Sequence, residues 1–94
     1  MQCNYNVRMS CKARKMARRL PANVRPKLER LVTDLSEKGP IQKEWRNFSV
    51  FYRGNYHCHL DRNWSACWRW DKGSGDIEIY YAGSRESAPC DGRG

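Results

Sequence analysis

Hydrophobic and polar residues alternate at the start of the chain and then change to a helical spacing. Between Asn4 and Ser10 every second residue is apolar, which predicts a half-buried strand. From Ser10, a helix-capping residue type, to about Arg19 the spacing predicts a helix that ends before Pro21. Its apolar stripe consists of Ala13, Met16, Ala17 and Leu20.

A second helix is predicted to begin near Asn23, which is also a capping residue type. Pro26 falls in its first turn, where a missing N–H costs little, and Gly39 followed by Pro40 ends it. We expect the two helices to form an antiparallel pair whose apolar stripes pack in the core. The stripe of the second helix consists of Val24, Leu28, Leu31, Val32 and Leu35.

After residue 44 the helical spacing is replaced by alternation, and aromatic residues become frequent. The short turns between the alternating stretches predict an antiparallel meander of about four strands. Together with the first strand and the helix pair, this order predicts an α+β domain with both helices on one face of a curved sheet. The four strands are expected at about 46–52, 55–60, 63–70 and 76–82.

The length and composition are those of one small globular domain. We expect a single domain over residues 1–94, with a flexible C-terminal tail over 86–94. A hydrophobic content of 39% with 30% charged residues is too apolar for a disordered chain and too polar for a membrane protein. The basic N-terminal region lacks the apolar stretch of a signal peptide, so a cytoplasmic protein without a membrane partner is expected.

The five cysteines are odd in number, and no export signal carries them to an oxidising compartment. We therefore expect reduced thiols. Because no Cys-x-x-Cys spacing occurs, the sequence excludes a zinc ribbon and a thioredoxin-type redox motif. The cysteines are Cys3, Cys11, Cys58, Cys67 and Cys90.

The formal net charge of +8 lies entirely in the first third of the chain. Residues 1–30 hold nine of the 18 Lys and Arg residues and one of the ten acids, so the remaining nine and nine cancel. Such a basic region can bind phosphates, dock an acidic protein, or serve only as a solvated helix surface. The candidate phosphate-binding residues in this region are Arg14, Lys15, Arg18 and Lys27.

The candidate chemistry lies on the predicted strand 55–60. If its other residues face the core, His57 and His59 share the opposite, open face, with Cβ atoms about 7 Å apart. Imidazoles transfer protons near neutral pH, which makes this pair a candidate acid and base. Two alternatives are hydrogen bonding to surface neighbours and zinc binding, although the sequence offers no obvious third metal ligand.

By the same alternation, Arg69 and Tyr80 also lie on the open face, whereas Ile77, Ile79 and Tyr81 face the core. Imidazoles beside a cation and a phenol can accept a proton, donate one and stabilise charge on a phosphate without a metal. No cofactor is therefore expected.

The strand, helix pair and meander, which end in Tyr80-Tyr81-Ala82-Gly83-Ser84-Arg85-Glu86, resemble the RelE/ParE toxin superfamily of bacterial toxin–antitoxin systems. The stretch from Tyr56 to Trp64 is similar to the Cys-His-hydrophobic-x-x-Asp-Trp segment of its YafQ-like branch. This resemblance implies that His59 is the catalytic histidine and Arg85 the catalytic cation after the last strand. Two positions depart from the pattern, where the aspartate and a C-terminal tyrosine are replaced by Asn63 and Cys90.

The resemblance implies a toxin that cuts messenger RNA in the decoding site of the ribosome and is neutralised by a cognate antitoxin. Two alternatives remain. ParE-type members bind DNA gyrase and are not nucleases, and a passive RNA-binding domain would need only the basic helices. The pair His57 and His59 with Arg85 favours the nuclease, since a protein that only binds a partner has no chemical need for it.

Overall fold

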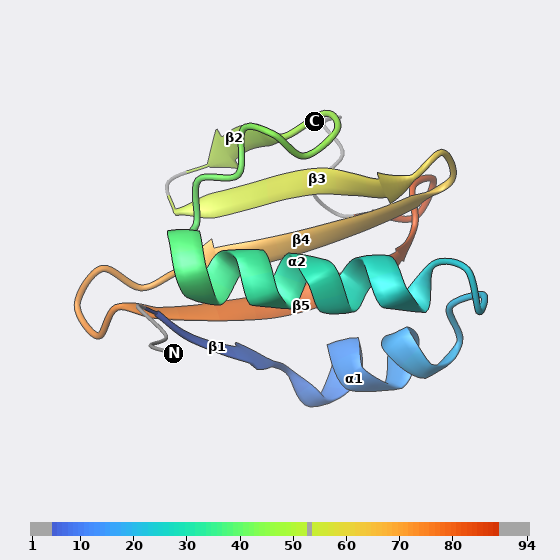
Figure 1. Cartoon of the computed structure of the whole chain (residues 1–94). Coiled ribbons are helices and arrows are strands. Elements are labelled where there is room, and N and C mark those ends of the chain that lie inside the picture. Colours follow the sequence, from blue (N-terminus) through green and yellow to red (C-terminus); the bar gives the residue numbers. More distant parts are fainter. Residues whose placement is uncertain (1–4, 53, 89–94) are drawn as a thin grey trace.

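The described residues form two helices and five strands, as the pattern of the sequence predicted (Figure 1). The computed structural model describes residues 5–52 and 54–88. Neither of the helices within these ranges is long and apolar enough to cross a membrane. The elements are β1 (Asn6–Met9), α1 (Cys11–Arg18), α2 (Arg25–Lys38), β2 (Ser49–Tyr52), β3 (Asn55–Asp61), β4 (Trp64–Trp70) and β5 (Asp76–Ser84).

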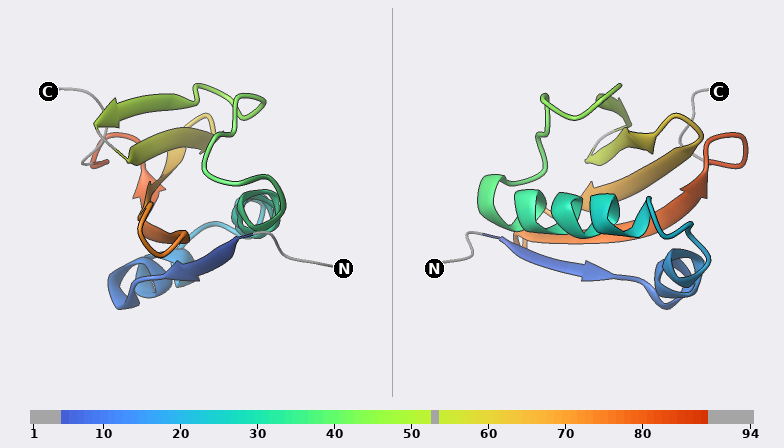
Figure 2. Two further views of the ribbon diagram at one scale, coloured as in Figure 1. Left: turned by 90° about the vertical axis from the view of Figure 1, so that its left-hand side faces the viewer. Right: turned by 45° about the vertical axis from the view of Figure 1, so that its right-hand side comes forward.

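All five strands form one sheet in the order β1-β5-β4-β3-β2. The strands from β2 to β5 are the predicted antiparallel meander. β1 pairs with β5 in parallel, with Asn6 opposite Asp76, so the first and last strands are neighbours and the sheet is mixed. Figure 2 shows the curvature that the sheet acquires from one edge to the other.

The main core lies between the sheet and α2, which crosses one face of it (Figures 1 and 2). Helix α1 lies beside β5 and contributes to both faces of the sheet. Ala13 joins the main core, whereas Met16 packs in a second cluster with Tyr81. The residues that α2 buries are Leu28, Leu31 and Leu35, against Tyr56, Cys58 and Leu60 of β3.

The start of α1 is predicted correctly and the start of α2 is not. Ser10 caps α1, because its hydroxyl oxygen accepts the backbone N–H of Ala13 at 3.0 Å. The cap of α2 is Val24 rather than Asn23, and no side chain caps this helix. The carbonyl of Pro21 accepts the backbone N–H groups of both Val24 and Arg25. Hydrogen bonds of the preceding turn thus replace the expected side-chain cap.

The prediction that Tyr81 faces the main core is wrong. The pairing of β4 with β5 shifts between Cys67, which is opposite Tyr81, and Trp68, which is opposite Ile79. Tyr80 is therefore the extra residue of a β-bulge, which reverses the alternation after it. Tyr81 packs in the second cluster, and its hydroxyl donates to the carbonyl of Ser84 at 2.7 Å.

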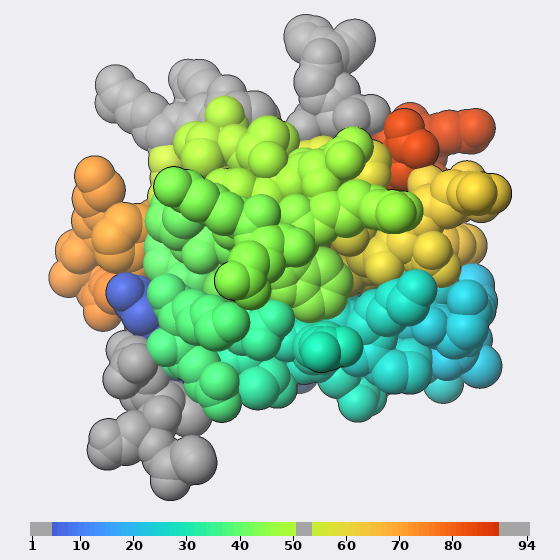
Figure 3. Space-filling model, turned by 45° about the horizontal axis from the view of Figure 1, so that its top comes forward, coloured from blue at the N-terminus to red at the C-terminus, as the bar shows by residue number. Residues whose placement is uncertain are grey.

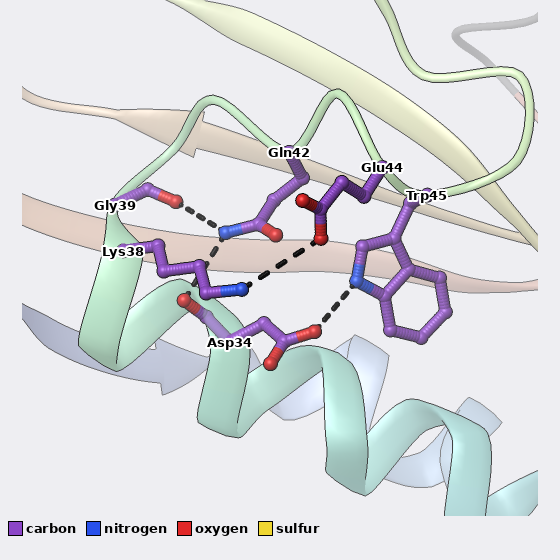
Figure 4. Close-up of polar contacts among 6 residues, drawn as sticks. All are labelled: Asp34, Lys38, Gly39, Gln42, Glu44 and Trp45. Atoms are coloured by element: carbon purple, nitrogen blue, oxygen red, sulfur yellow. Dashed lines mark hydrogen bonds and ion pairs between the residues drawn. The ribbon is translucent and has the colours of Figure 1, made fainter.

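The connection between α2 and β2 is held to the helix by side chains (Figure 4). The Gln42 amide donates to the carbonyls of Asp34, at 3.1 Å, and Gly39, at 2.8 Å. The Trp45 indole N–H donates to the Asp34 carboxylate at 2.8 Å. In addition, the buried Trp68 indole donates to the carbonyl of Pro40 at 3.1 Å. These bonds fix the segment that leads into the edge strand β2.

Gly39 ends α2 in a backbone conformation that only glycine adopts readily, with φ +95°. A Cβ atom here would lie 2.7 Å from the ring of Tyr5. We expect Gly39→Ala to lower the free energy of unfolding by about 2–4 kcal/mol, because backbone strain and overpacking add. The control is Gly75→Ala, with φ +82° and no atom within 4 Å, which adds strain alone. Equal losses for the two variants in urea denaturation would contradict the clash with Tyr5.

Candidate functional site

His57 and His59 of β3 lie on the face of the sheet opposite α2. Their neighbours Tyr56, Cys58 and Leu60 pack in the main core, so the strand alternation places both imidazoles on the other side. The ring centroids are 5.2 Å apart, and the rings meet edge to face. One phosphate group can contact both rings at this separation.

The face that carries the imidazoles is not open, contrary to the expectation from the sequence. His57 and His59 are only 6% and 7% exposed, and Ser65 beside them is fully buried. The alternation of a strand shows which residues share a face, but it does not show whether another segment covers that face. Here a second cluster forms on it, where side chains from α1 and from the C-terminal turn pack against Cys67 and Tyr81, namely Met16 and Ala88.

Two serines lie beside the imidazoles, and the pattern of the sequence did not indicate the contact that one of them makes. Ser49 of β2 lies opposite His57, and its hydroxyl oxygen is 3.2 Å from Nδ1. Ser65 lies opposite His59, and its buried hydroxyl has no hydrogen-bond partner within residues 5–52 and 54–88. Only the strand register shows the Ser49 contact, because the two residues lie on different strands.

Arg69 and Tyr80 form a second polar group toward the Asn55 end of the same face. The Arg69 guanidinium carbon lies 4.5 Å from the centre of the Tyr80 ring, and its Nε is 3.4 Å from Glu78. The Tyr80 hydroxyl donates to the Asn55 side chain at 3.2 Å. Burial raises the pKa of Tyr80, and Arg69 opposes part of that shift. The phenol therefore keeps its proton near neutral pH and is suited to donate one.

Arg85 lies at the other end of the face, beside the β3–β4 turn. Its Nη1 donates to the carbonyl of Arg62 at 3.0 Å, and its backbone N–H donates to Asn63 at 2.9 Å. It lines a hollow of about 420 Å³ together with Asn63 and Trp64. The four expected catalytic residues are thus spread along the strands, with Tyr80 at one end, the imidazoles between, and Arg85 at the other.

The expected phosphate-binding residues of the basic region lie on the helices. Arg14, Lys15 and Arg18 are exposed on α1. Lys27 of α2 contacts the Asp61 carboxylate at 3.4 Å. The backbone N–H of Arg62 is the main cause that lowers the pKa of Asp61, and Lys27 and Arg46 act in the same direction. A carboxylate therefore accompanies Lys27, which the charge count of the sequence alone did not reveal.

The expectation that all cysteines are reduced is wrong for Cys67, which is disulfide-bonded. An odd cysteine count does not show which thiols a fold brings within bonding distance. Cys11 and Cys58 are free thiols, and burial raises the pKa of Cys58, so that thiol stays protonated. Cys3 and Cys90 lie outside the described residues. In the described part of the chain, no three His, Cys, Asp or Glu side chains form a group that could hold a metal.

Solved structures of RelE-like toxins share this fold. The archaeal RelE of the RelE–RelB complex from Pyrococcus horikoshii is 14% identical, with a TM-score of 0.72 over 90% of this chain and 99% of that one. The isolated E. coli RelE toxin is 17% identical, with a TM-score of 0.71 over 90% and 88%. The YoeB dimer from Staphylococcus aureus is 13% identical, with a TM-score of 0.68 over 85% and 95%. No protein-family model and no curated protein sequence matches the chain.

Because His59 is nearly buried, its substitution affects the stability of the fold as well as any activity. We expect His59→Ala to lower the free energy of unfolding by about 1–3 kcal/mol, because removal of a ring that is only 7% exposed leaves a cavity. His59→Gln keeps most of the volume and a hydrogen-bonding side chain, so it should lose less. Thermal unfolding of the two variants measures the difference. An alanine variant as stable as the parent would show that the ring is not packed in solution.

Proposed function

We propose, from the RelE-like fold and the paired imidazoles on its second face, that this chain is the toxin of a toxin–antitoxin pair. Its activity is metal-independent endonucleolytic cleavage of messenger RNA on the ribosome, which inhibits translation. The observation that carries the proposal is the 5.2 Å separation of the His57 and His59 rings. Imidazole is the side chain most often used for proton transfer, so two imidazoles held on one strand are suited to act as an acid and a base on one phosphodiester.

In the proposed reaction, one imidazole takes the proton of a 2′-hydroxyl, and the resulting oxygen attacks the adjacent phosphorus. The bond from phosphorus to the 5′-oxygen breaks, and a second side chain, acting as the acid, donates a proton to this oxygen. The products are a 2′,3′-cyclic phosphate and a 5′-hydroxyl end. Fixed cations are required because negative charge accumulates on the phosphate oxygens in the transition state.

The position of each side chain along the strands supports a division of these tasks. His59 lies opposite Ser65, which in turn lies opposite Gly83, two residues before Arg85. His59 and the Arg85 guanidinium are therefore assigned to the scissile phosphate. His57, oriented by Ser49, and the protonated Tyr80 are the candidates for the leaving oxygen. Both rings are nearly buried. In the proposed reaction a phosphate therefore reaches them after the side chains of the second cluster have moved aside.

The proposed toxin function implies two kinds of partner, an antitoxin protein and RNA. A cognate antitoxin would neutralise the toxin, and the complexes solved for RelE with RelB are the precedent for such a pair. The exposed cations Arg14, Lys15 and Arg18 on α1 are suited to either ribosomal RNA or an acidic antitoxin. The ribosome as target places the activity in the cytoplasm.

Cleavage of a message in a reconstituted translation reaction, mapped by primer extension with and without ribosomes, tests this function. We expect His59→Gln to reduce the cleavage rate by about 10²–10⁴, the usual contribution of a general acid or base. The glutamine variant preserves the fold better than alanine, and circular dichroism checks it. Full cleavage by His59→Gln would remove this imidazole from the mechanism. Growth inhibition with intact messages but blocked gyrase would instead identify a ParE-like binder.

Arg85→Ala should reduce the cleavage rate by about 10²-fold or more, as expected when one fixed donor to the developing charge is lost. Arg85→Lys should restore little, because an ammonium group does not span two phosphate oxygens. Arg62→Ala is the matched control, since it removes a neighbouring guanidinium and keeps the backbone carbonyl that Arg85 contacts. Near-full activity of Arg85→Lys would show that charge alone matters at this position.

A further inference from the structure

A cavity of about 530 Å³ lies between α2, residues 44–46 and the end of β3. Figure 3 shows the side of the molecule on which α2 and the segment after it meet. Three cations line this cavity, Lys27, Arg30 and Arg46, and so do three acids and the Trp45 indole. No residue of the cavity has a task in the cleavage proposed above except His59, whose ring lies on the opposite face.

Each of the three carboxylates already has a structural partner. Asp34 accepts the Trp45 indole N–H at 2.8 Å, and Glu44 is 3.8 Å from the Lys38 ammonium (Figure 4). Asp61 accepts the backbone N–H of Arg62 at 2.7 Å, and its other oxygen is 3.4 Å from the Lys27 ammonium. The three carboxylates therefore connect the segments that line the cavity.

The guanidinium groups of Arg30 and Arg46 form no ion pair within residues 5–52 and 54–88. Both residues are exposed, and they approach the cavity from different elements, α2 and the connection before β2. With Lys38 counted against Glu44, the cavity and its rim carry four cations and three carboxylates. Arg46 is near enough to Asp61 to help lower the pKa of that carboxyl, but neither guanidinium is held by an ion pair in the described residues. Both are therefore suited to an anion with several acceptor oxygens, such as a phosphodiester.

Trp45 adds an aromatic surface in a fixed orientation. Part of its ring packs against the main core, and its indole N–H is held by Asp34. Aromatic rings beside arginines bind the bases of single-stranded nucleic acid, because every base can stack on a ring. An acidic peptide would satisfy the guanidinium groups but would make no use of this ring.

The cavity is connected to the imidazole pair through the backbone of β3. The carbonyl of Arg46 accepts the backbone N–H of His59 at 2.8 Å, so the cavity wall and the candidate acid or base share one hydrogen bond. A ligand in the cavity therefore lies next to the segment that pairs with the backbone of His59.

We propose that this cavity binds one nucleotide of a single-stranded RNA, with Arg30 and Arg46 on the phosphate and Trp45 against the base. The choice of RNA rests on the proposed function, which the cavity extends by a second contact away from the imidazoles. The nucleotide belongs either to the message or to ribosomal RNA, and the two sources share this chemistry.

Fluorescence anisotropy with a short labelled 2′-O-methyl RNA tests the proposal, because this probe has no 2′-hydroxyl and cannot be cleaved. Arg30→Ala/Arg46→Ala should bind it at least about tenfold more weakly. The plot of log affinity against log salt should flatten by about 0.7, since the two arginines share one phosphate and each neutralised phosphate of a single strand contributes about 0.7. The matched control is Arg8→Ala/Lys72→Ala, which also removes two exposed charges but lies outside the cavity.

Two further variants test the aromatic contact. Trp45→Leu should weaken binding of the probe about tenfold, the order of magnitude of one lost stacking contact. Trp45→Phe keeps a ring but loses the bond to Asp34, and it should retain most of the affinity. If Arg30→Ala/Arg46→Ala and Arg8→Ala/Lys72→Ala affect affinity and salt dependence equally, the proposal is wrong. It is also wrong if the double variant keeps its RNA affinity but loses binding to a labelled polyglutamate peptide, which would identify a protein dock.

Sedimentation with ribosomes distinguishes the two sources of RNA. Loss of association by Arg30→Ala/Arg46→Ala without message assigns the cavity to ribosomal RNA, and loss only with message present assigns it to the message. Failure of the proposed nuclease remains separate. A parent protein that cleaves no message but shows the arginine-dependent binding overturns the nuclease alone, and cleavage without such binding overturns the nucleotide site alone.

Discussion

The packing of Tyr56, Cys58 and Leu60 against α2 determines where the chemistry of this domain lies. Because side chains alternate along a strand, burying these three residues places His57 and His59 on the other face. A slip of one residue in the pairing of β3 would bury both imidazoles under α2 and expose the core residues. The hydrophobic core thus fixes the register that the candidate site needs.

The sequence was sufficient for the elements whose hydrophobic pattern is strong. Both helices and all five strands occur close to the expected positions, and Ser10 caps α1 as its residue type indicated. The failures involve interactions that no local pattern records. Tyr81 changes face because of a bulge at Tyr80, and Val24 replaces Asn23 at the start of α2 because the preceding turn supplies the hydrogen bonds. The covering of the imidazole face depends on packing from distant segments.

Some residues of the candidate site could be predicted from strand alternation, and others could not. His57, His59 and Arg69 share a face by alternation alone, whereas Ser49 joins them only through the pairing of β2 with β3. The cavity beside α2 could not be predicted in this way, since its cations come from two separate regions of the chain, α2 and the connection before β2. The structural role of its carboxylates is visible only once their partners are known. Charge counts identify a basic protein, and the fold decides which of those charges remain unpaired.

The parallel pairing of β1 with β5 ties the beginning of the described chain to its end, with Asn6 opposite Asp76. Contacts between residues so far apart in sequence form late, because a long loop must close first. A ribosome that synthesises this protein from the N-terminus releases β5 last, so β1 lacks its strand partner while the rest of the chain emerges. Assembly of the sheet, and of any activity that depends on it, is thereby deferred until synthesis of β5 is complete.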